Sequence, residues 1–202
     1  MRKLFIIAAN ALLIYWEIIG LVLNIQQYGV GLFVYYTQLS NILAMLTSLL
    51  LIIYTTIDKS PRWLRFLRYQ TTCCLTITFL VVLFLFAPPD NYQNSFFIGS
   101  AYYHHLLCPI LTFISFLILE KGAKITLKDT LCSLIPTIVY GLVLIPLNIF
   151  GKVNGPYFFL EFHKQPIQTC IVWLFLVLVA AYLIGLMIKA GSNLLSRYEK
   201  KN

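Results

Sequence analysis

Six long apolar stretches, separated by short polar segments, dominate the pattern of the chain. Each stretch has close to the ~20 residues that a helix needs to cross the ~30 Å hydrocarbon layer of a bilayer. We place them at roughly residues 4–25, 31–56, 69–88, 96–119, 128–150 and 168–190. The connections leave no room for a soluble domain. The pattern therefore predicts an all-α fold, a single six-helix transmembrane domain over residues 1–202.

Composition also favours a membrane protein. Hydrophobic residues make up 60% of the chain, charged residues 11%, and the mean hydropathy is +0.84. A water-soluble core does not absorb that much apolar sequence. The first stretch is too long for a cleaved signal peptide and lacks a small-residue cleavage site before Asn24, so we interpret it as a retained helix.

The distribution of Lys and Arg predicts the orientation. One side of the predicted membrane domain carries 13 of the 15 basic residues: Arg2, Lys3, Lys59, Arg62, Arg65, Arg68, Lys121, Lys124, Lys128, Lys189, Arg197, Lys200 and Lys201. The other side carries only Lys152 and Lys164. By the positive-inside rule, both termini are cytoplasmic. The net charge of +8 is thus explained by topology, and no nucleic-acid partner is expected.

One basic connection, residues 61–68, has an amphipathic pattern. Trp63, Phe66 and Leu67 fall roughly on one helical face among three arginines. Such a segment is typical of an interfacial anchor that lies on anionic lipid.

Cysteine and histidine spacing does not favour a metal site. The five cysteines all fall in predicted helices without a C-x-x-C pair, and we interpret them as small packing residues. His163 lies in a predicted loop without neighbouring ligands. We expect neither a metal nor another cofactor.

Polar residues inside the apolar stretches carry most of the functional information, because they persist in lipid mainly where they face a cavity or a partner. With a rise of ~1.5 Å per residue, Glu17, Thr37, His104 and His105 all fall ~9–14 Å below the exoplasmic end of their helices. Gln38, Ser40 and Asn41 continue inward from Thr37. The sequence therefore predicts one polar layer in the exoplasmic leaflet.

Each of these residues also has an ordinary structural explanation. A Thr hydroxyl in a membrane helix usually bonds back to the i−4 carbonyl, and Ser40 or Asn41 can bond across helices. Glu17 is either protonated, paired with a histidine, or facing water. Adjacent histidines project about 100° apart on a helix, so at most one of His104 and His105 points squarely into a site.

Three segments of the chain resemble landmarks of a known family. They are Tyr35–Asn41 (YYTQLSN) in the second stretch, His104–Pro109 (HHLLCP) in the fourth, and Gly155–Glu161 (GPYFFLE) in the last exoplasmic loop. In order and in predicted topology they resemble the androgen-induced gene 1 family of six-helix membrane proteins, which includes the androgen-dependent TFPI-regulating protein. The chain is most similar to the compact bacterial members, so the resemblance implies a multi-pass protein of the bacterial cytoplasmic membrane.

The resemblance implies a hydrolase with a threonine nucleophile and a histidine base, which in the animal members cleaves fatty acid esters of hydroxy fatty acids. The family's threonine matches Thr37. Its histidine lies a fixed number of residues before a proline, which is Pro109 here. The spacing in the animal members matches His104, whereas the bacterial pattern of histidine, three residues and proline matches His105. We favour His105. Glu161 stands where bacterial relatives often have Asp, a departure that bears on substrate preference.

The chemistry implied by the resemblance is physically reasonable. A Thr hydroxyl becomes a nucleophile when a base within ~2.6–3.2 Å takes its proton. Asn41 or Ser40 would donate to the developing oxyanion, and Glu161 or Glu17 would orient the imidazole. Tyr157 and Gln38 are further candidates for substrate binding. A membrane lipid is the expected partner, entering sideways from the outer leaflet.

Three alternatives stay open at the level of sequence. The first is an acyl transferase, in which a second lipid replaces water. The second is a carrier or channel, which would need polar residues that continue to the cytoplasmic side; below Pro109 the fourth stretch offers only Thr112 and Ser115. The third is a non-catalytic lipid-binding protein whose polar layer is structural.

Overall fold

The computed structural model describes residues 1–198, and over that range it consists of helices and connecting loops without β-strands. The α-helices are α1 Arg2–Tyr28, α2 Tyr36–Thr56, α3 Arg62–Val81, α4 Tyr92–Phe96, α5 Cys108–Ile114, α6 Leu127–Cys132, α7 Ile135–Ile149 and α8 Ile167–Tyr198. The 3₁₀ turns are η1 Gly29–Val34 and η5 Phe158–Leu160, and the π-helical turns are η2 Val82–Phe86, η3 Tyr102–Leu107 and η4 Ser115–Leu119. Lys200 and Lys201, counted above for orientation, lie outside the described residues.

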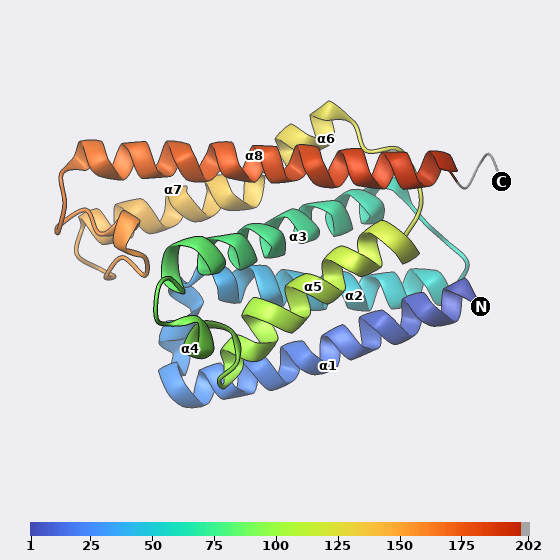
Figure 1. Cartoon of the computed structure of the whole chain (residues 1–202), viewed down its shortest axis with the longest axis horizontal. Coiled ribbons are helices and arrows are strands. Elements are labelled where there is room, and N and C mark those ends of the chain that lie inside the picture. Colours follow the sequence, from blue (N-terminus) through green and yellow to red (C-terminus); the bar gives the residue numbers. More distant parts are fainter. Residues whose placement is uncertain (199–202) are drawn as a thin grey trace.

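The described residues form six helices that are long and apolar enough to span a membrane, which confirms the predicted fold class. The start of α1 and the end of α8 lie at one end of the bundle (Figure 1). We call this the terminal end, and we call the opposite end, which carries α4 and the segment between α7 and α8, the far end. The basic residues predict that the terminal end is cytoplasmic.

Helix α3 is the central helix of the bundle. More than half of its most apolar window is buried, against a third or less for each of the other spans. Its neighbours are α2, α5 and α8 (Figure 1). The largest apolar cluster, which includes Tyr69, Phe116 and Ile184, joins α3 to α8 and to η4. Outward-facing Leu, Ile, Val and Phe side chains on the other spans are exposed, as expected of helices that contact lipid.

The third span begins at Arg62 instead of at residue 69, so the prediction of a basic connection over residues 61–68 was wrong. Pro61 occupies the N-cap with an extended backbone, and the helix starts directly after it. Arg65 and Arg68 are consequently carried into the bundle and buried, instead of lying on the membrane surface. A long aliphatic stem allows Arg to enter an apolar helix when its guanidinium finds partners.

Arg68 finds a carboxylate inside the bundle. Its Nε and Nη2 donate to the two carboxylate oxygens of Glu120 at 2.9 and 2.7 Å, and its Nη1 donates to Ser48 Oγ at 3.0 Å. Ser115 Oγ adds a donor to Glu120 at 2.6 Å. Burial alone would raise the pKa of the Glu120 carboxyl, but the Arg68 guanidinium and the Ser115 hydroxyl bring it below its ordinary value. Arg68 and Glu120 thus form a buried ion pair that joins α3 to the end of η4.

The buried face of α1 has a regular pattern. Asn10, Leu13, Glu17 and Gly20 are its buried residues, spaced alternately by three and four positions along one face of the helix. The face packs against α2, α5 and η3. Two polar side chains and a glycine therefore lie on the same side of α1 as its apolar contacts.

The fourth span is interrupted in a way that the sequence pattern did not predict. We expected a helix over residues 96–119, whereas the structure ends the short α4 at Phe96 and begins again at Tyr102. Gly99 between them has a positive φ of 58° that a residue with a Cβ rarely adopts. The fifth span is similarly divided into α6 and α7 just before Pro136, because proline cannot continue the hydrogen bonding of a preceding helix.

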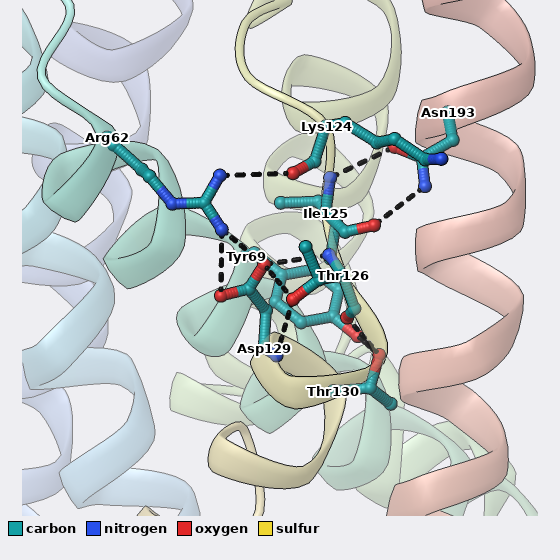
Figure 2. A network of polar contacts seen from close by, with 8 residues as sticks. All are labelled: Arg62, Tyr69, Lys124, Ile125, Thr126, Asp129, Thr130 and Asn193. Atoms are coloured by element: carbon teal, nitrogen blue, oxygen red, sulfur yellow. Dashed lines mark hydrogen bonds and ion pairs between the residues drawn. The ribbon is translucent and has the colours of Figure 1, made fainter.

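A polar network holds α6 between α3 and α8 (Figure 2). Thr126 and Asp129 cap the start of α6 reciprocally, and Arg62 donates to Asp129 Oδ2 at 3.0 Å. The Asn193 amide of α8 pairs with both backbone groups of Ile125, at 3.0 and 2.8 Å. These bonds satisfy the backbone where the chain turns into the fifth span.

We expect Arg68→Ala to lower the free energy of unfolding by about 3–5 kcal/mol, because it leaves a buried carboxylate unpaired. Thermal unfolding in detergent measures the loss. The matched control is Arg62→Ala, which removes an arginine from the exposed pair with Asp129 and should cost about 1 kcal/mol or less. Equal losses in the two variants would contradict the role of the pair.

The same pair predicts a pH dependence. Because the folded pKa of Glu120 is below its ordinary value of 4.5, its contribution to stability is complete at neutral pH. We expect that contribution to disappear as the pH falls below 4.5 and through the lowered pKa. In Arg68→Ala this part of the acid dependence of the melting temperature should be absent.

Candidate functional site

A cavity of about 530 Å³ opens at the far end of the bundle. Thr37 at the start of α2 and both histidines of η3 line it, although they come from two spans separated by the whole of α3. Asn24, Gln38, Ser95, Ser100 and Tyr157 are among its other polar lining residues. The structure therefore brings the predicted hydroxyl and the predicted imidazoles to one cavity.

His105 has one ring nitrogen bonded to the backbone. Its Nδ1 lies 2.9 Å from the carbonyl oxygen of Ser95, at the end of α4. A carbonyl oxygen only accepts hydrogen bonds, so Nδ1 carries the proton and Nε2 of the neutral ring has a free lone pair. Among the described residues no group is bonded to Nε2. The local bonding thus presents His105 as a neutral imidazole with a basic nitrogen.

His104 is bonded on both sides of its ring and is almost fully buried, at 1% exposure. The Asn24 amide donates to Nδ1 at 3.0 Å, which leaves the proton on Nε2. Nε2 faces Glu17, with the carboxylate oxygen Oε2 at 3.3 Å and the carbonyl oxygen at 3.4 Å. The ring of His104 is therefore held in place by α1 and has no free lone pair.

The side chains of the two histidines point in different directions because η3 packs against two different helices. It is a π-helical turn packed between α1 on one side and α4 on the other. Such turns recur at functional sites, where they re-aim side chains relative to an α-helix. His104 points to α1, and His105 points to the carbonyl that the interruption after α4 makes available.

Gly20 makes the position of His104 possible. A Cβ at Gly20 would lie 2.3 Å from Nε2 and 2.5 Å from Cδ2 of His104. The imidazole therefore packs directly on the α1 backbone, at a place where only glycine leaves enough room.

A chain of amide and hydroxyl groups extends the His104 contacts to α2. Ser100 Oγ donates to Asn24 Oδ1 at 2.7 Å, and Asn24 Nδ2 donates to Gln38 Oε1 at 2.8 Å. Gln38 thus lines the cavity as part of the same network that orients His104. Its Nε2 has no hydrogen-bond partner among the described residues.

Thr37 lies in the first turn of α2, where backbone N–H groups have no partner within the helix. Its N–H donates instead to the Tyr157 hydroxyl oxygen, 3.3 Å away. Burial raises the pKa of the Tyr157 phenol above its ordinary value, so this group stays protonated at neutral pH and can donate a hydrogen bond.

A second, apolar cavity of about 80 Å³ meets the first at Thr37. It lies between α2, α3, α7 and α8 and is lined by aliphatic and aromatic side chains such as Ile77, Val81 and Val177. Thr37, Val82, Phe86 and Tyr157 line both cavities. The Thr37 hydroxyl therefore lies where a polar cavity passes into an apolar one.

Four of the predicted supporting residues do not line the cavity, namely Glu17, Ser40, Asn41 and Glu161. Asn41 Nδ2 donates to the carbonyl oxygens of Thr37 and His104, at 2.7 and 3.4 Å, and Ser40 Oγ donates to the Thr37 carbonyl at 2.9 Å. Neither residue lines the cavity, so the expected oxyanion donors instead hold the first turn of α2. Glu161 pairs with Lys164 at 2.9 Å and does not reach either histidine.

Sequence reasoning missed Asn24 and Ser95. Asn24 follows Gly20 by four positions and so continues the three-and-four spacing of the buried face of α1. Extending that spacing along the sequence would have identified it. Ser95 contributes a backbone carbonyl, and no side-chain pattern reveals which carbonyl an interrupted helix will free.

No protein-family model, no curated protein and no solved structure matches the chain. The resemblance to the androgen-induced gene 1 family therefore stays a prediction, and the argument for function depends on the geometry of the site.

We expect Gly20→Ala to displace the His104 ring, because the added methyl group would overlap it. The cost of such overpacking is about 1–3 kcal/mol, measured as a lower free energy of unfolding. Gly31→Ala is the matched control, since a Cβ at Gly31 meets nothing within 4 Å. A Gly20→Ala variant as stable as Gly31→Ala would show that the ring does not pack on α1.

Proposed function

We propose that the protein is an intramembrane lipid ester hydrolase, with Thr37 as the nucleophile and His105 as the general base. One observation carries the proposal: Thr37 and His105 line the same cavity, and the Ser95 carbonyl leaves His105 Nε2 unprotonated. A hydroxyl and a free imidazole nitrogen are the minimum set for nucleophilic acyl transfer. The resemblance to the androgen-induced gene 1 family predicts the same pair.

In the proposed reaction, His105 Nε2 takes the proton of the Thr37 hydroxyl as Oγ1 attacks the ester carbonyl carbon. The carbonyl π electrons move to oxygen, and the Tyr157 hydroxyl is placed to donate to that oxyanion. The C–O bond to the leaving alcohol then breaks, and the imidazolium returns the proton to that alcohol. Water, deprotonated by the same nitrogen, releases the fatty acid from the acyl-threonine in a second round.

The two cavities suggest the form of the substrate. The apolar cavity between α2, α3, α7 and α8 has room for the first few carbons of an acyl chain, and the polar cavity is large enough for the other side of the ester. Fatty acid esters of hydroxy fatty acids, or related lipids, carry an acyl chain on one side of the ester and a chain with a free carboxyl group on the other. If the terminal end is cytoplasmic, as the basic residues predict, such a substrate enters from the outer leaflet. An acyl transferase would use the same groups with a second lipid as acceptor.

His104 has a positioning role in this proposal. Its ring is fixed by Asn24 and Glu17 and its backbone carbonyl accepts from Asn41, which also holds the Thr37 carbonyl. Displacing His104 would therefore disturb both η3 and the start of α2. Glu17 orients His104 and does not contact His105 directly.

A membrane carrier is the second candidate, because buried polar side chains continue toward the terminal end. Sequence analysis found few of them, but the structure buries Asn10, Thr47, Ser48 and Thr112, followed by the Arg68–Glu120 pair. On the fourth span Thr112 and Ser115 are the residues that continue, as the sequence indicated, and the other spans supply the further buried polar side chains. The test reconstitutes Thr37→Ala in proteoliposomes and measures the flux of substrate or protons across the vesicle membrane. A carrier would still give such flux, whereas an esterase does not require it.

Fluorophosphonate labelling with intact mass as the readout tests the hydrolase directly. We expect one adduct on the wild-type protein and none on Thr37→Ala or His105→Ala, with ester hydrolysis lowered about 10²–10⁴-fold in His105→Ala. His105→Ala should lose less thermal stability than His104→Ala, because only the Ser95 carbonyl loses a hydrogen-bond partner. His104→Ala should be clearly less stable, because it leaves the buried Glu17 carboxyl and Asn24 amide without their partner. An adduct that persists in Thr37→Ala would refute the assignment of the nucleophile.

Tyr157→Phe tests the oxyanion donor while keeping the aromatic ring and its packing. We expect kcat for ester hydrolysis to fall about 10²–10³-fold, the usual size for loss of one such donor, with little change in KM. Tyr69→Phe is a matched control, because its hydroxyl donates to the Gly185 carbonyl and Tyr69 lines neither cavity. Equal rates for Tyr157→Phe and wild type would remove Tyr157 from the mechanism.

A further inference from the structure

A separate cavity of about 390 Å³ lies at the terminal end of the bundle. It is bordered by the start of α1, the end of α2, the start of α3 and the segment that follows η4. Six basic side chains line it, namely Arg2, Lys3, Lys59, Arg65, Arg68 and Lys121, against only two acidic ones, Asp58 and Glu120. The hydrolase site at the far end shares no residue with it.

Both acidic residues are already engaged. Glu120 is bonded bidentately by Arg68 and accepts a further bond from Ser115. Asp58 forms an ion pair with Lys3. Neither carboxylate forms a hydrogen bond or an ion pair with Arg65 or Lys59, so these two cations are not paired with the acids that line the cavity.

Arg65 is the residue that most clearly lacks an anion. It is 7% exposed, and its Nη2 donates to Ser192 Oγ at 2.7 Å. Its guanidinium carbon lies 4.3 Å from the centre of the Phe116 ring. The other two guanidinium nitrogens, Nε and Nη1, have no hydrogen-bond acceptor among the described residues. Burying a charged donor without an acceptor costs several kcal/mol unless a ligand supplies one.

We propose that this cavity binds the phosphate group of an anionic ligand, with Arg65 as the principal contact and Lys59 at the mouth. One of the two unpaired guanidinium N–H groups of Arg65 would donate to a phosphate oxygen, and a second oxygen remains for the Lys59 ammonium group. Lys59 and Ser60 are exposed, so the cavity opens to the surroundings at this end. Phospholipid head groups lie at this depth of a membrane, and basic pockets between helices are a known mode of binding them.

The test measures binding to the detergent-purified full chain by native mass spectrometry and thermal shift. The probes are a short-chain phosphatidic acid, a short-chain phosphatidylcholine as the zwitterionic comparison, and inorganic phosphate. We expect phosphatidic acid to bind the wild type more tightly than phosphatidylcholine and to raise its melting temperature. Arg65→Gln should weaken that binding at least about tenfold, as expected for loss of a charge-assisted contact.

Arg62→Gln is the matched control, because it removes the same charge three residues earlier on α3 but does not line the cavity. It should change the affinity less than about threefold. If Arg65→Gln does not fold, Lys59→Gln at the exposed mouth should still weaken binding several-fold. Competition by millimolar inorganic phosphate would mean that the phosphate group alone suffices, whereas its failure would mean that the ligand is a lipid head group. Equal binding of phosphatidic acid and phosphatidylcholine, or equal losses in Arg65→Gln and Arg62→Gln, would overturn the proposal.

Discussion

Polar side chains inside an apolar bundle must find their partners within the protein, and this requirement organises both ends of the molecule. At the far end, Asn24 and Glu17 occupy the two ring nitrogens of His104 and connect α1 to η3. Asn24 also donates to Gln38, which connects this cluster to α2. At the terminal end, Arg68 and Glu120 connect α3 to η4. The two clusters lie on opposite sides of the apolar core and fix the spans at both ends.

The difference between the two histidines follows from the same requirement. His104 is hydrogen-bonded on both ring nitrogens by groups of α1, so it has no free lone pair. His105 donates its Nδ1–H to a backbone carbonyl, and the lone pair on its Nε2 stays free. Adjacent residues of identical chemistry thus receive different roles from the groups that face them. This division of roles allows one ring to hold the site together while the other is available for proton transfer.

The sequence predicted the parts of this structure that depend on length and polarity. Six apolar runs predicted six spans, and helix depth predicted that Thr37, His104 and Glu17 share a layer. Thr37 and His104 do line one cavity, and Glu17 contacts His104 from outside it. It did not predict the groups that depend on exact backbone geometry, such as the Ser95 carbonyl that the break after α4 exposes. Nor did it predict that Arg65 and Arg68 are buried, because arginines beside an apolar run are equally typical of a loop.

The tautomers of the histidines test the central claim most directly, since the account requires His105 to be protonated on Nδ1 and free on Nε2. Side-chain ¹⁵N NMR of histidine-labelled protein at about pH 9, where imidazoles are neutral, reads each tautomer separately. The three histidines can be assigned with single His→Gln variants. We predict an Nδ1–H tautomer for His105, and Nε2–H tautomers for His104 and for His163, whose Nε2 faces the Asn148 carbonyl at 2.9 Å. An Nε2–H tautomer at His105 would contradict the account, because that nitrogen would then have no lone pair to accept the Thr37 proton.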